Sequence, residues 1–154
     1  MSDNYMVERT TTISAPPATV FAKISDLTQW DQWSPWAHLD PDMTVTHAGD
    51  PASVGQHYAW SGNRKVGEGN MTITNVDAPN EVELDLHFLK PFKSESDLTW
   101  RVEPEGDGSR VIWNMTGANT FMIKMMARFG KGMDKQVGPD FEAGLAKLKQ
   151  LLET

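Results

Sequence analysis

Cysteine is absent from this chain of 154 residues. Disulfide bonds, thiolate metal sites and a cysteine nucleophile are therefore excluded. Long apolar runs are missing as well, since none approaches the roughly 18 to 20 residues that a membrane-spanning helix needs. The first residues, Met1 to Asn4, lack the basic segment and apolar block of a signal peptide. We therefore expect a cytoplasmic protein without stable membrane insertion.

Positive charge is also scarce. The 14 Lys and Arg residues face 21 Asp and Glu residues, which gives a formal net charge of −7. Nucleic-acid binding depends on cationic contacts with phosphate, so we do not expect a nucleic-acid partner. The four histidines form neither an H-x-H nor an H-E-x-x-H pattern, and no Gly-x-Ser-x-Gly string marks a nucleophile. The sequence therefore predicts neither a metal nor a cofactor.

Tryptophan and methionine, by contrast, are plentiful. The chain has six Trp and nine Met, and Trp30, Trp33 and Trp36 fall within one short stretch. Such side chains fill cores, but they also line pockets for apolar ligands. The length and the apolar fraction of 39% suit a globular core, and we predict a single domain over residues 1–154.

The hydropathy pattern predicts the order of the elements. Residues 5–14 suit a strand, and Pro16-Pro17 suits the first turn of a short helix over about 16–26. A second short helical segment covers 26–36, and a period of two follows from 43 to 119, enough for about six antiparallel strands. An apolar stripe at helical spacing predicts a long helix over 134–153 that covers the sheet. The fold class is therefore α+β.

Several stretches resemble the START-like (SRPBCC) superfamily, in its polyketide cyclase/dehydrase branch. They are Ile13 to Phe21, Trp30 to Trp36, Gly67 to Thr74, Phe88 to Lys93 and Phe141 to Leu145. The resemblance implies a helix-grip fold, in which a curved antiparallel sheet of about seven strands wraps a long C-terminal helix. Two short helices follow the first strand, and a cavity lies between sheet and helix. Superfamily members bind lipids, sterols, polyketides or other apolar molecules, and a minority are enzymes.

We therefore predict that an apolar or amphipathic small molecule, lipid-like or polyketide-like, binds in this internal cavity. The candidate ligand-binding residues are apolar side chains on the expected inner faces, together with two serines as polar anchors. They are Trp33, Trp36, Tyr58, Trp60, Met71, Leu86, Phe88, Ser94, Ser96, Trp100, Trp113, Met126, Phe129, Met133 and Phe141. Two alternatives stay open: the tryptophans plug one end of the sheet, or the serines bond to local backbone.

The Met-rich segment from Phe121 to Met133 has an apolar stripe at helical spacing. It is interpreted as an amphipathic segment packed on the domain, as a lid hinged at Gly130 and Gly132, or as a surface that docks on a membrane.

The alternative function is a polyketide cyclase/dehydrase-like enzyme. Such an enzyme needs an ionisable group that faces inward and moves protons. The candidates are Tyr58, and Arg9, which shares a strand face with Val7. A third hypothesis is an interaction module whose interior is packed core. The catalytic residues, the ligand and the oligomeric state stay unassigned at this point.

Overall fold

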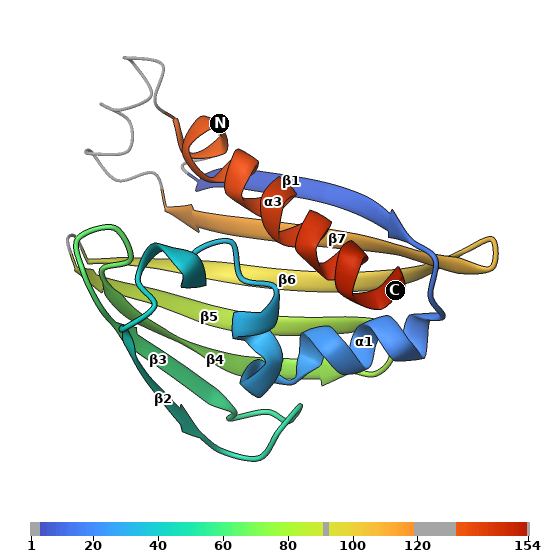
Figure 1. Cartoon of the computed structure of the whole chain (residues 1–154), viewed down its shortest axis with the longest axis horizontal. Coiled ribbons are helices and arrows are strands. Elements are labelled where there is room, and N and C mark those ends of the chain that lie inside the picture. Colours follow the sequence, from blue (N-terminus) through green and yellow to red (C-terminus); the bar gives the residue numbers. More distant parts are fainter. Residues whose placement is uncertain (1–3, 91–92, 119–131, 154) are drawn as a thin grey trace.

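The computed structural model describes residues 4–90, 93–118 and 132–153 (Figure 1). The elements follow the predicted order. The first part holds β1 (Asn4–Ile13), α1 (Pro17–Ser25) and two 3-10 helices, η1 (Leu27–Gln32) and η2 (Ala37–Leu39). The strands are β2 (Thr44–Ala48), β3 (His57–Ser61), β4 (Glu68–Asp77), β5 (Glu81–Lys90), β6 (Ser94–Glu105) and β7 (Gly108–Ala118). The last element is α3 (Met133–Glu153).

The seven strands form one antiparallel sheet in the order β1-β7-β6-β5-β4-β3-β2. The chain folds back so that β1 pairs with β7, the last strand. The sheet curves, α3 lies along β1 and β7, and α1 covers the other side of the same face (Figure 1). The expected α+β helix-grip architecture is thus confirmed. Among the described residues, no helix is long and apolar enough to cross a membrane.

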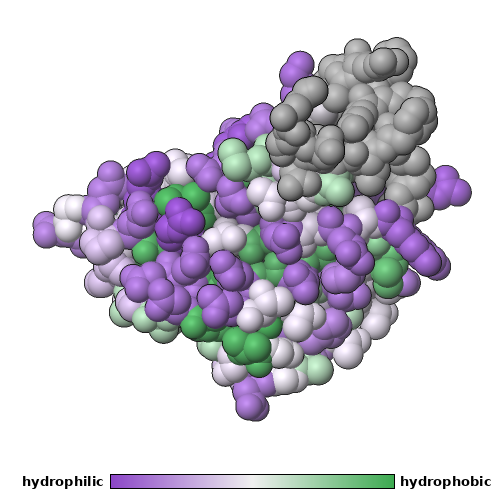
Figure 2. Space-filling view, turned by 180° about the vertical axis from the view of Figure 1, so that it is seen from behind, coloured by the Kyte–Doolittle hydropathy of each residue, from purple (hydrophilic) through white to green (hydrophobic). Residues whose placement is uncertain are grey.

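Alternation places the core on one face of the sheet. In β5, Val82, Leu84 and Leu86 are buried, while Glu83 and Asp85 between them are only partly covered. Apolar side chains gain roughly 25 cal/mol for each Å² removed from water, which fixes the register of such a strand. Viewed from behind the sheet, the surface is mostly hydrophilic with scattered hydrophobic groups (Figure 2).

The helix α3 covers the apolar face with its predicted stripe. Phe141, Leu145 and Leu148 are all buried, as their helical spacing predicts. Gly144 lies where a Cβ atom would stand 2.9 Å from the Trp113 ring, so a glycine allows α3 to approach the sheet closely. The helix and the concave face of the sheet therefore form the two walls of the interior.

Candidate functional site

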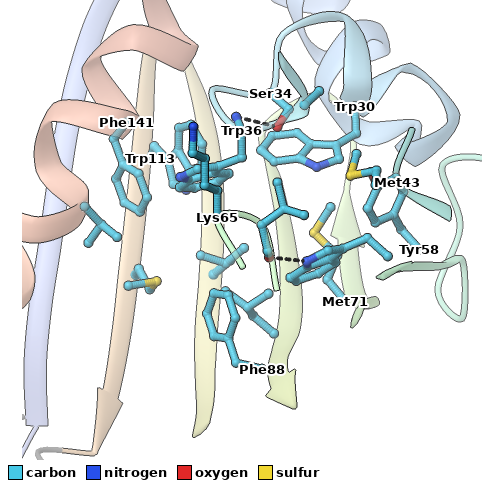
Figure 3. A pocket seen from close by; sticks show the side chains of 17 residues that line it. Trp30, Ser34, Trp36, Met43, Tyr58, Lys65, Met71, Phe88, Trp113 and Phe141 are labelled. Atoms are coloured by element: carbon cyan, nitrogen blue, oxygen red, sulfur yellow. Dashed lines mark hydrogen bonds between the residues drawn. The ribbon is translucent and has the colours of Figure 1, made fainter. Parts of the chain in front are cut away.

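An apolar cavity of about 230 Å³ lies between the concave face of the sheet, α3 and the segment that contains η1 and η2 (Figure 3). Apolar side chains supply most of the wall, and Ser34, Tyr58 and Lys65 supply polar atoms. The lining residues are Trp30, Ser34, Trp36, Ala37, Met43, Tyr58, Trp60, Lys65, Val66, Met71, Leu86, Phe88, Leu98, Trp113, Met115, Val137 and Phe141.

The cavity brings together more than half of the candidate residues. Those in its wall are Trp36, Tyr58, Trp60, Met71, Leu86, Phe88, Trp113 and Phe141. They come from five different elements and from the connection before η2, so only the folded sheet and α3 place them side by side. Trp113 stacks on Phe141 with ring centroids 4.1 Å apart and an interplanar angle of 9°, which joins the sheet wall to the helix wall.

Trp33 and Trp100 do not line the cavity. Both are 1% exposed and pack in a tryptophan cluster beside it, with their ring centroids 5.2 Å apart. Trp30 contacts both rings and also faces the cavity. Of the three neighbouring tryptophans, Trp33 therefore belongs to the packed plug, while Trp30 and Trp36 belong to the wall.

The reason for this split is local backbone geometry. The 3-10 helix η1 ends at Gln32, and Trp33 has φ −128° and ψ 1°, outside the helical region. A spacing of three puts residues on one face only while a helix continues. The chain turns at Trp33 instead, which directs its indole into the core.

Ser94 and Ser96 do not line the cavity either. Ser96 lies on the inner face of β6, as predicted, and is only 6% exposed. Its hydroxyl forms a hydrogen bond with the Tyr5 hydroxyl from β1. Burial is the main cause that raises the pKa of Tyr5. The partner of this buried serine is thus a tyrosine side chain, rather than a ligand or local backbone.

Three further candidates cannot be assigned to the wall. Met126 and Phe129 lie outside the described residues, as do most of the Met-rich segment and its Gly130 hinge. Met133 is the first residue of α3. The predicted lid therefore stays a prediction.

Sequence reasoning missed several lining residues that come from turns. Ser34, Met43, Lys65 and Val66 lie between regular elements, where no periodicity reports which way a side chain points. Met115 could have been found, because it shares the inner face of β7 with Trp113.

Tyr58 is a buried polar side chain of the wall, being 2% exposed like Ser34. Its hydroxyl donates a hydrogen bond to Asp31 Oδ1. Burial is the largest cause that raises the pKa of Tyr58, and the bond to the Asp31 carboxylate raises it further. Tyr58 is therefore a neutral phenol whose proton is already held by a partner.

The other polar contacts shape the wall. Ser34 Oγ accepts a hydrogen bond of 3.1 Å from the Trp36 backbone N–H (Figure 3). Trp60 Nε1 donates one of 2.8 Å to the Val66 carbonyl, across the turn between β3 and β4. A Cβ atom at position 69 would stand 2.6 Å from the Trp60 ring, so a glycine is needed there for the indole to pack against the strand. The space above Gly69 is thus filled by Trp60.

Three buried indole nitrogens, those of Trp33, Trp100 and Trp113, have no hydrogen-bond acceptor within the described part of the chain. Leaving a buried donor unpaired costs about 1–3 kcal/mol. These nitrogens have almost no accessible surface, so they do not open into the cavity. Across residues 4–90, 93–118 and 132–153, no cluster of three His, Asp or Glu side chains could hold a metal ion.

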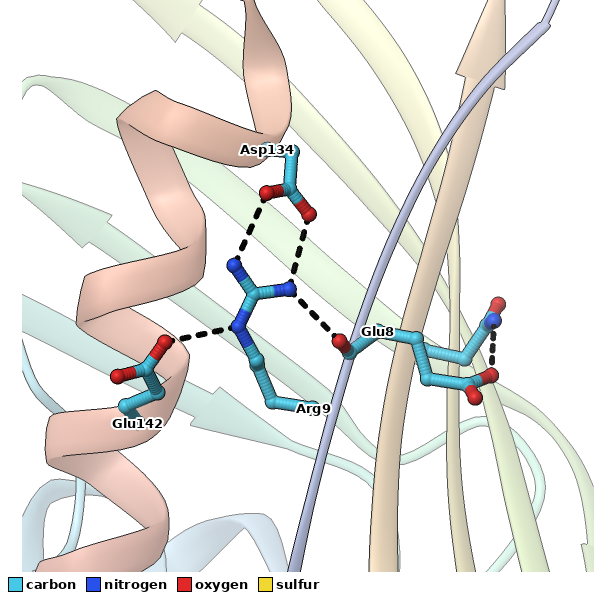
Figure 4. A network of polar contacts seen from close by, with 5 residues as sticks. Glu8, Arg9, Asp134 and Glu142 are labelled. Carbon is cyan, nitrogen blue, oxygen red and sulfur yellow. Dashed lines mark hydrogen bonds and ion pairs between the residues drawn. The ribbon is translucent and has the colours of Figure 1, made fainter.

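Arg9, the second candidate for proton transfer, lies outside the cavity wall. It faces α3, as its strand phase predicts, and its Nε donates to Glu142 Oε2 at 2.8 Å (Figure 4). Its Nη1 and Nη2 donate to the two Asp134 oxygens at 2.8 and 3.0 Å. This fork pins the start of α3 to the edge strand β1 and holds the pKa of Asp134 below its ordinary value. Arg9 thus positions a helix.

Comparison with solved structures supports the fold. A protein from Chromobacterium violaceum superimposes with a TM-score of 0.68 at 14% identity, covering 100% of this chain and 99% of that chain. The Aha1 dimer from Colwellia psychrerythraea gives a TM-score of 0.61 at 18% identity, covering 97% and 96%. Ara h 8.0201 gives 0.63 at 13% identity, covering 96% and 99%. At these identities the likeness concerns the fold alone.

Sequence comparison identifies the family as well as the fold. No curated protein matches the chain. The sequence model of one family, described as polyketide cyclase / dehydrase and lipid transport, matches residues 6–153. That match covers all the described elements apart from the first residues of β1. The chain belongs to the polyketide cyclase / dehydrase and lipid transport family of the START-like superfamily.

Proposed function

We propose that this protein binds an apolar or amphipathic small molecule in the cavity between the sheet and α3. The observation that carries the proposal is an apolar cavity of about 230 Å³ between the sheet and α3. Protein interiors contain few voids larger than a water molecule, because each void forfeits dispersion contacts. A ligand that fills such a space restores these contacts and stabilises the folded state.

The volume limits the size of the ligand. An apolar cavity of about 150 Å³ holds a benzene molecule, and drug-sized ligands occupy pockets of roughly 300 Å³ or more. A space of about 230 Å³ suits one or two fused rings, or an acyl or polyketide fragment of similar bulk. The lipid-like or polyketide-like ligand is therefore small.

The enzyme alternative lacks a supporting observation. A general acid or base works best with a pKa near the operating pH. The pKa of Tyr58 is raised further above neutral pH, and its hydroxyl proton is donated to Asp31 in a hydrogen bond. Arg9 is held by Asp134 and Glu142, away from the cavity. Binding without turnover is the function that these contacts support.

A pair of alanine variants tests the proposal. Ala37 lines the cavity, whereas Ala59 lies in β3 between Tyr58 and Trp60 and points to the opposite face. The probe is the neutral two-ring dye prodan, whose emission shifts in apolar surroundings. We expect saturable binding to the wild type and a loss of about tenfold in affinity for Ala37→Phe, since overfilling a packed site is unfavourable.

The matched control, Ala59→Phe, should bind prodan like the wild type. Circular dichroism and thermal unfolding verify that both variants fold. Unsaturable binding to the wild type, or equal affinities for both variants, would contradict the proposal and favour an interior that serves only as core.

A further inference from the structure

We infer that the ligand carries an anionic group, a carboxylate in the simplest case, and that Lys65 holds this group where the cavity opens. The inference rests on the proposed function and adds the chemical class of the ligand. Lys65 is the one exposed side chain among the described lining residues, whereas the others are buried or partly buried, and we call the rim of the cavity at Lys65 the mouth. Figure 3 shows the Lys65 side chain among the residues that line the cavity.

The backbone that carries Lys65 is fixed by hydrogen bonds. Asn63 Oδ1 accepts the N–H groups of Lys65 at 2.9 Å and of Val66 at 3.2 Å, and the Gly67 N–H donates to the Asn63 carbonyl at 2.8 Å. The bond from Trp60 Nε1 to the Val66 carbonyl ties the same turn to the cavity wall. The turn is therefore a defined platform, although its residues are exposed.

Further bonds tie this platform to the segment after η2. The Asn63 N–H donates to Asp40 Oδ2 at 2.8 Å, and Asn63 Nδ2 donates to the Leu39 carbonyl at 3.1 Å. Asp40 Oδ1 accepts the Asp42 N–H at 3.0 Å. The carboxylate beside the turn is thus engaged by backbone donors, and the Lys65 ammonium makes no ion pair within the described residues.

The charge of Lys65 and the apolar character of the remaining wall together indicate the class of ligand. Lys65 is the sole charged side chain among the described residues that line the cavity, and the rest of the wall is almost entirely apolar. Burying an unpaired carboxylate in such a wall is very unfavourable, whereas a carboxylate at the mouth keeps water and gains a cation. The stem of a lysine covers apolar surface while its ammonium stays in water. A molecule with an apolar body and one terminal acid group satisfies both regions.

The overall charge sharpens this expectation. A formal net charge of −7 repels anions from most of the surface, and solvent screens that field over about 8–10 Å. Lys65 places a positive charge at the mouth, where the neighbouring Asp40 carboxylate is already engaged by backbone donors. Recognition of an acid by this protein must therefore come from the mouth itself.

The experiment compares two probes of the same shape by isothermal titration calorimetry. 2-Naphthoate is anionic at neutral pH, and 2-naphthamide is its neutral counterpart. We expect the wild type to bind naphthoate about fivefold more tightly at low salt, the upper end of the range for an exposed ion pair. Added salt should reduce this preference, because ions screen exposed charges.

Substitutions at the turn assign the preference to one side chain. Lys65→Met should abolish the preference, measured as the ratio of the two affinities within one protein, and Lys65→Arg should retain it. The matched control is Arg64→Gln, which removes the same charge from the neighbouring residue, one that does not line the cavity. It should keep the preference of the wild type.

The outcomes separate the two proposals. If neither probe binds, the proposed function is wrong. If naphthamide binds and naphthoate binds no better, the cavity binds apolar molecules and the inference about Lys65 is wrong. An equal loss of preference in Lys65→Met and Arg64→Gln would also overturn it, because general electrostatics would then explain the effect.

Discussion

The concave face of the sheet has a filled region and a hollow region. In the filled region, Trp33 and Trp100 pack among the other tryptophans, and α1 covers the strands with Val20 and Phe21. In the hollow region, the wall of the cavity includes Tyr58. The strands alternate in the same way under both regions. What differs is the covering segment, so burial of a strand residue does not reveal whether it packs or lines a cavity.

The largest expected effect comes from truncation in the filled region. Trp100 is 1% exposed and contacts Trp30, Trp33 and Trp113. We expect Trp100→Ala to lower the free energy of unfolding by about 3–5 kcal/mol, the cost of an unfilled aromatic site. Urea titration followed by circular dichroism measures this change.

The matched variant in the hollow region is Phe88→Ala. Phe88 is only half-buried and already borders the cavity, so its removal takes away fewer packing contacts. We expect less than half the loss found for Trp100→Ala. Equal losses would mean that the two regions are packed alike and would remove the distinction between them.

The fold was predictable from the sequence because periodicity reports which side of an element is buried. The alternation of β5 and the stripe of α3 follow from Val82, Leu84, Phe141 and Leu145 alone. The cavity was only partly predictable. Its strand residues have periodic signals, but Lys65 lies in a turn, where local hydrogen bonds set the side-chain direction.

The contrast between Trp33 and Trp36 shows the same limit within one segment. Both have the same residue type and lie near each other in the sequence, yet one is core and the other lines the cavity. Their difference depends on the end of η1 at Gln32, and boundaries of short 3-10 helices have weak sequence signals. The partner of Ser96 was not predictable from local sequence either, since Tyr5 lies 91 positions away in the chain.

A smaller effect is expected at the boundary of the hollow region, from Tyr58→Phe. This variant removes the hydrogen bond to Asp31 but keeps the ring. We expect a loss of about 0.5–1.5 kcal/mol in the free energy of unfolding near neutral pH, the usual net value of one hydrogen bond. Prodan affinity should change less than about twofold, because the phenol proton points to Asp31. A large loss of affinity would show that the ligand contacts the hydroxyl directly.

The pH dependence of this loss checks its cause. The pKa of Tyr58 is raised in the folded state above its ordinary value of 10.0. A raised pKa contributes stability that is complete below the unfolded pKa and is lost as pH rises toward the folded one. The difference between wild type and Tyr58→Phe should therefore be constant up to about pH 9 and shrink as the pH rises above about 10. A constant difference would mean that burial and Asp31 do not perturb the phenol.

The smallest effect is expected at Arg9, which pins the helix that both regions share. The side chains of Arg9, Asp134 and Glu142 are 26%, 58% and 62% exposed, so solvent screens the two ion pairs. We expect Arg9→Met to cost less than about 1 kcal/mol near neutral pH, as for other exposed pairs. Because Arg9 holds the pKa of Asp134 below its ordinary value of 3.8, this contribution is present above that pH. It is lost as pH falls through the lower, folded-state pKa.

Urea titrations of both proteins at about pH 6 and about pH 3 measure this difference above and below the ordinary pKa of Asp134. The wild type should be more stable than Arg9→Met at the higher pH, and the difference should narrow at the lower one. Lys23→Met is the control, since the Lys23 ammonium donates to the uncharged Gln32 side chain and should lose no carboxylate-dependent stability. Prodan binding to Arg9→Met should stay close to that of the wild type, because Arg9 lies outside the cavity wall. A large loss of affinity with an intact fold would instead tie the shape of the hollow region to the anchoring of α3, since Val137 and Phe141 line the cavity from the helix that Arg9 holds.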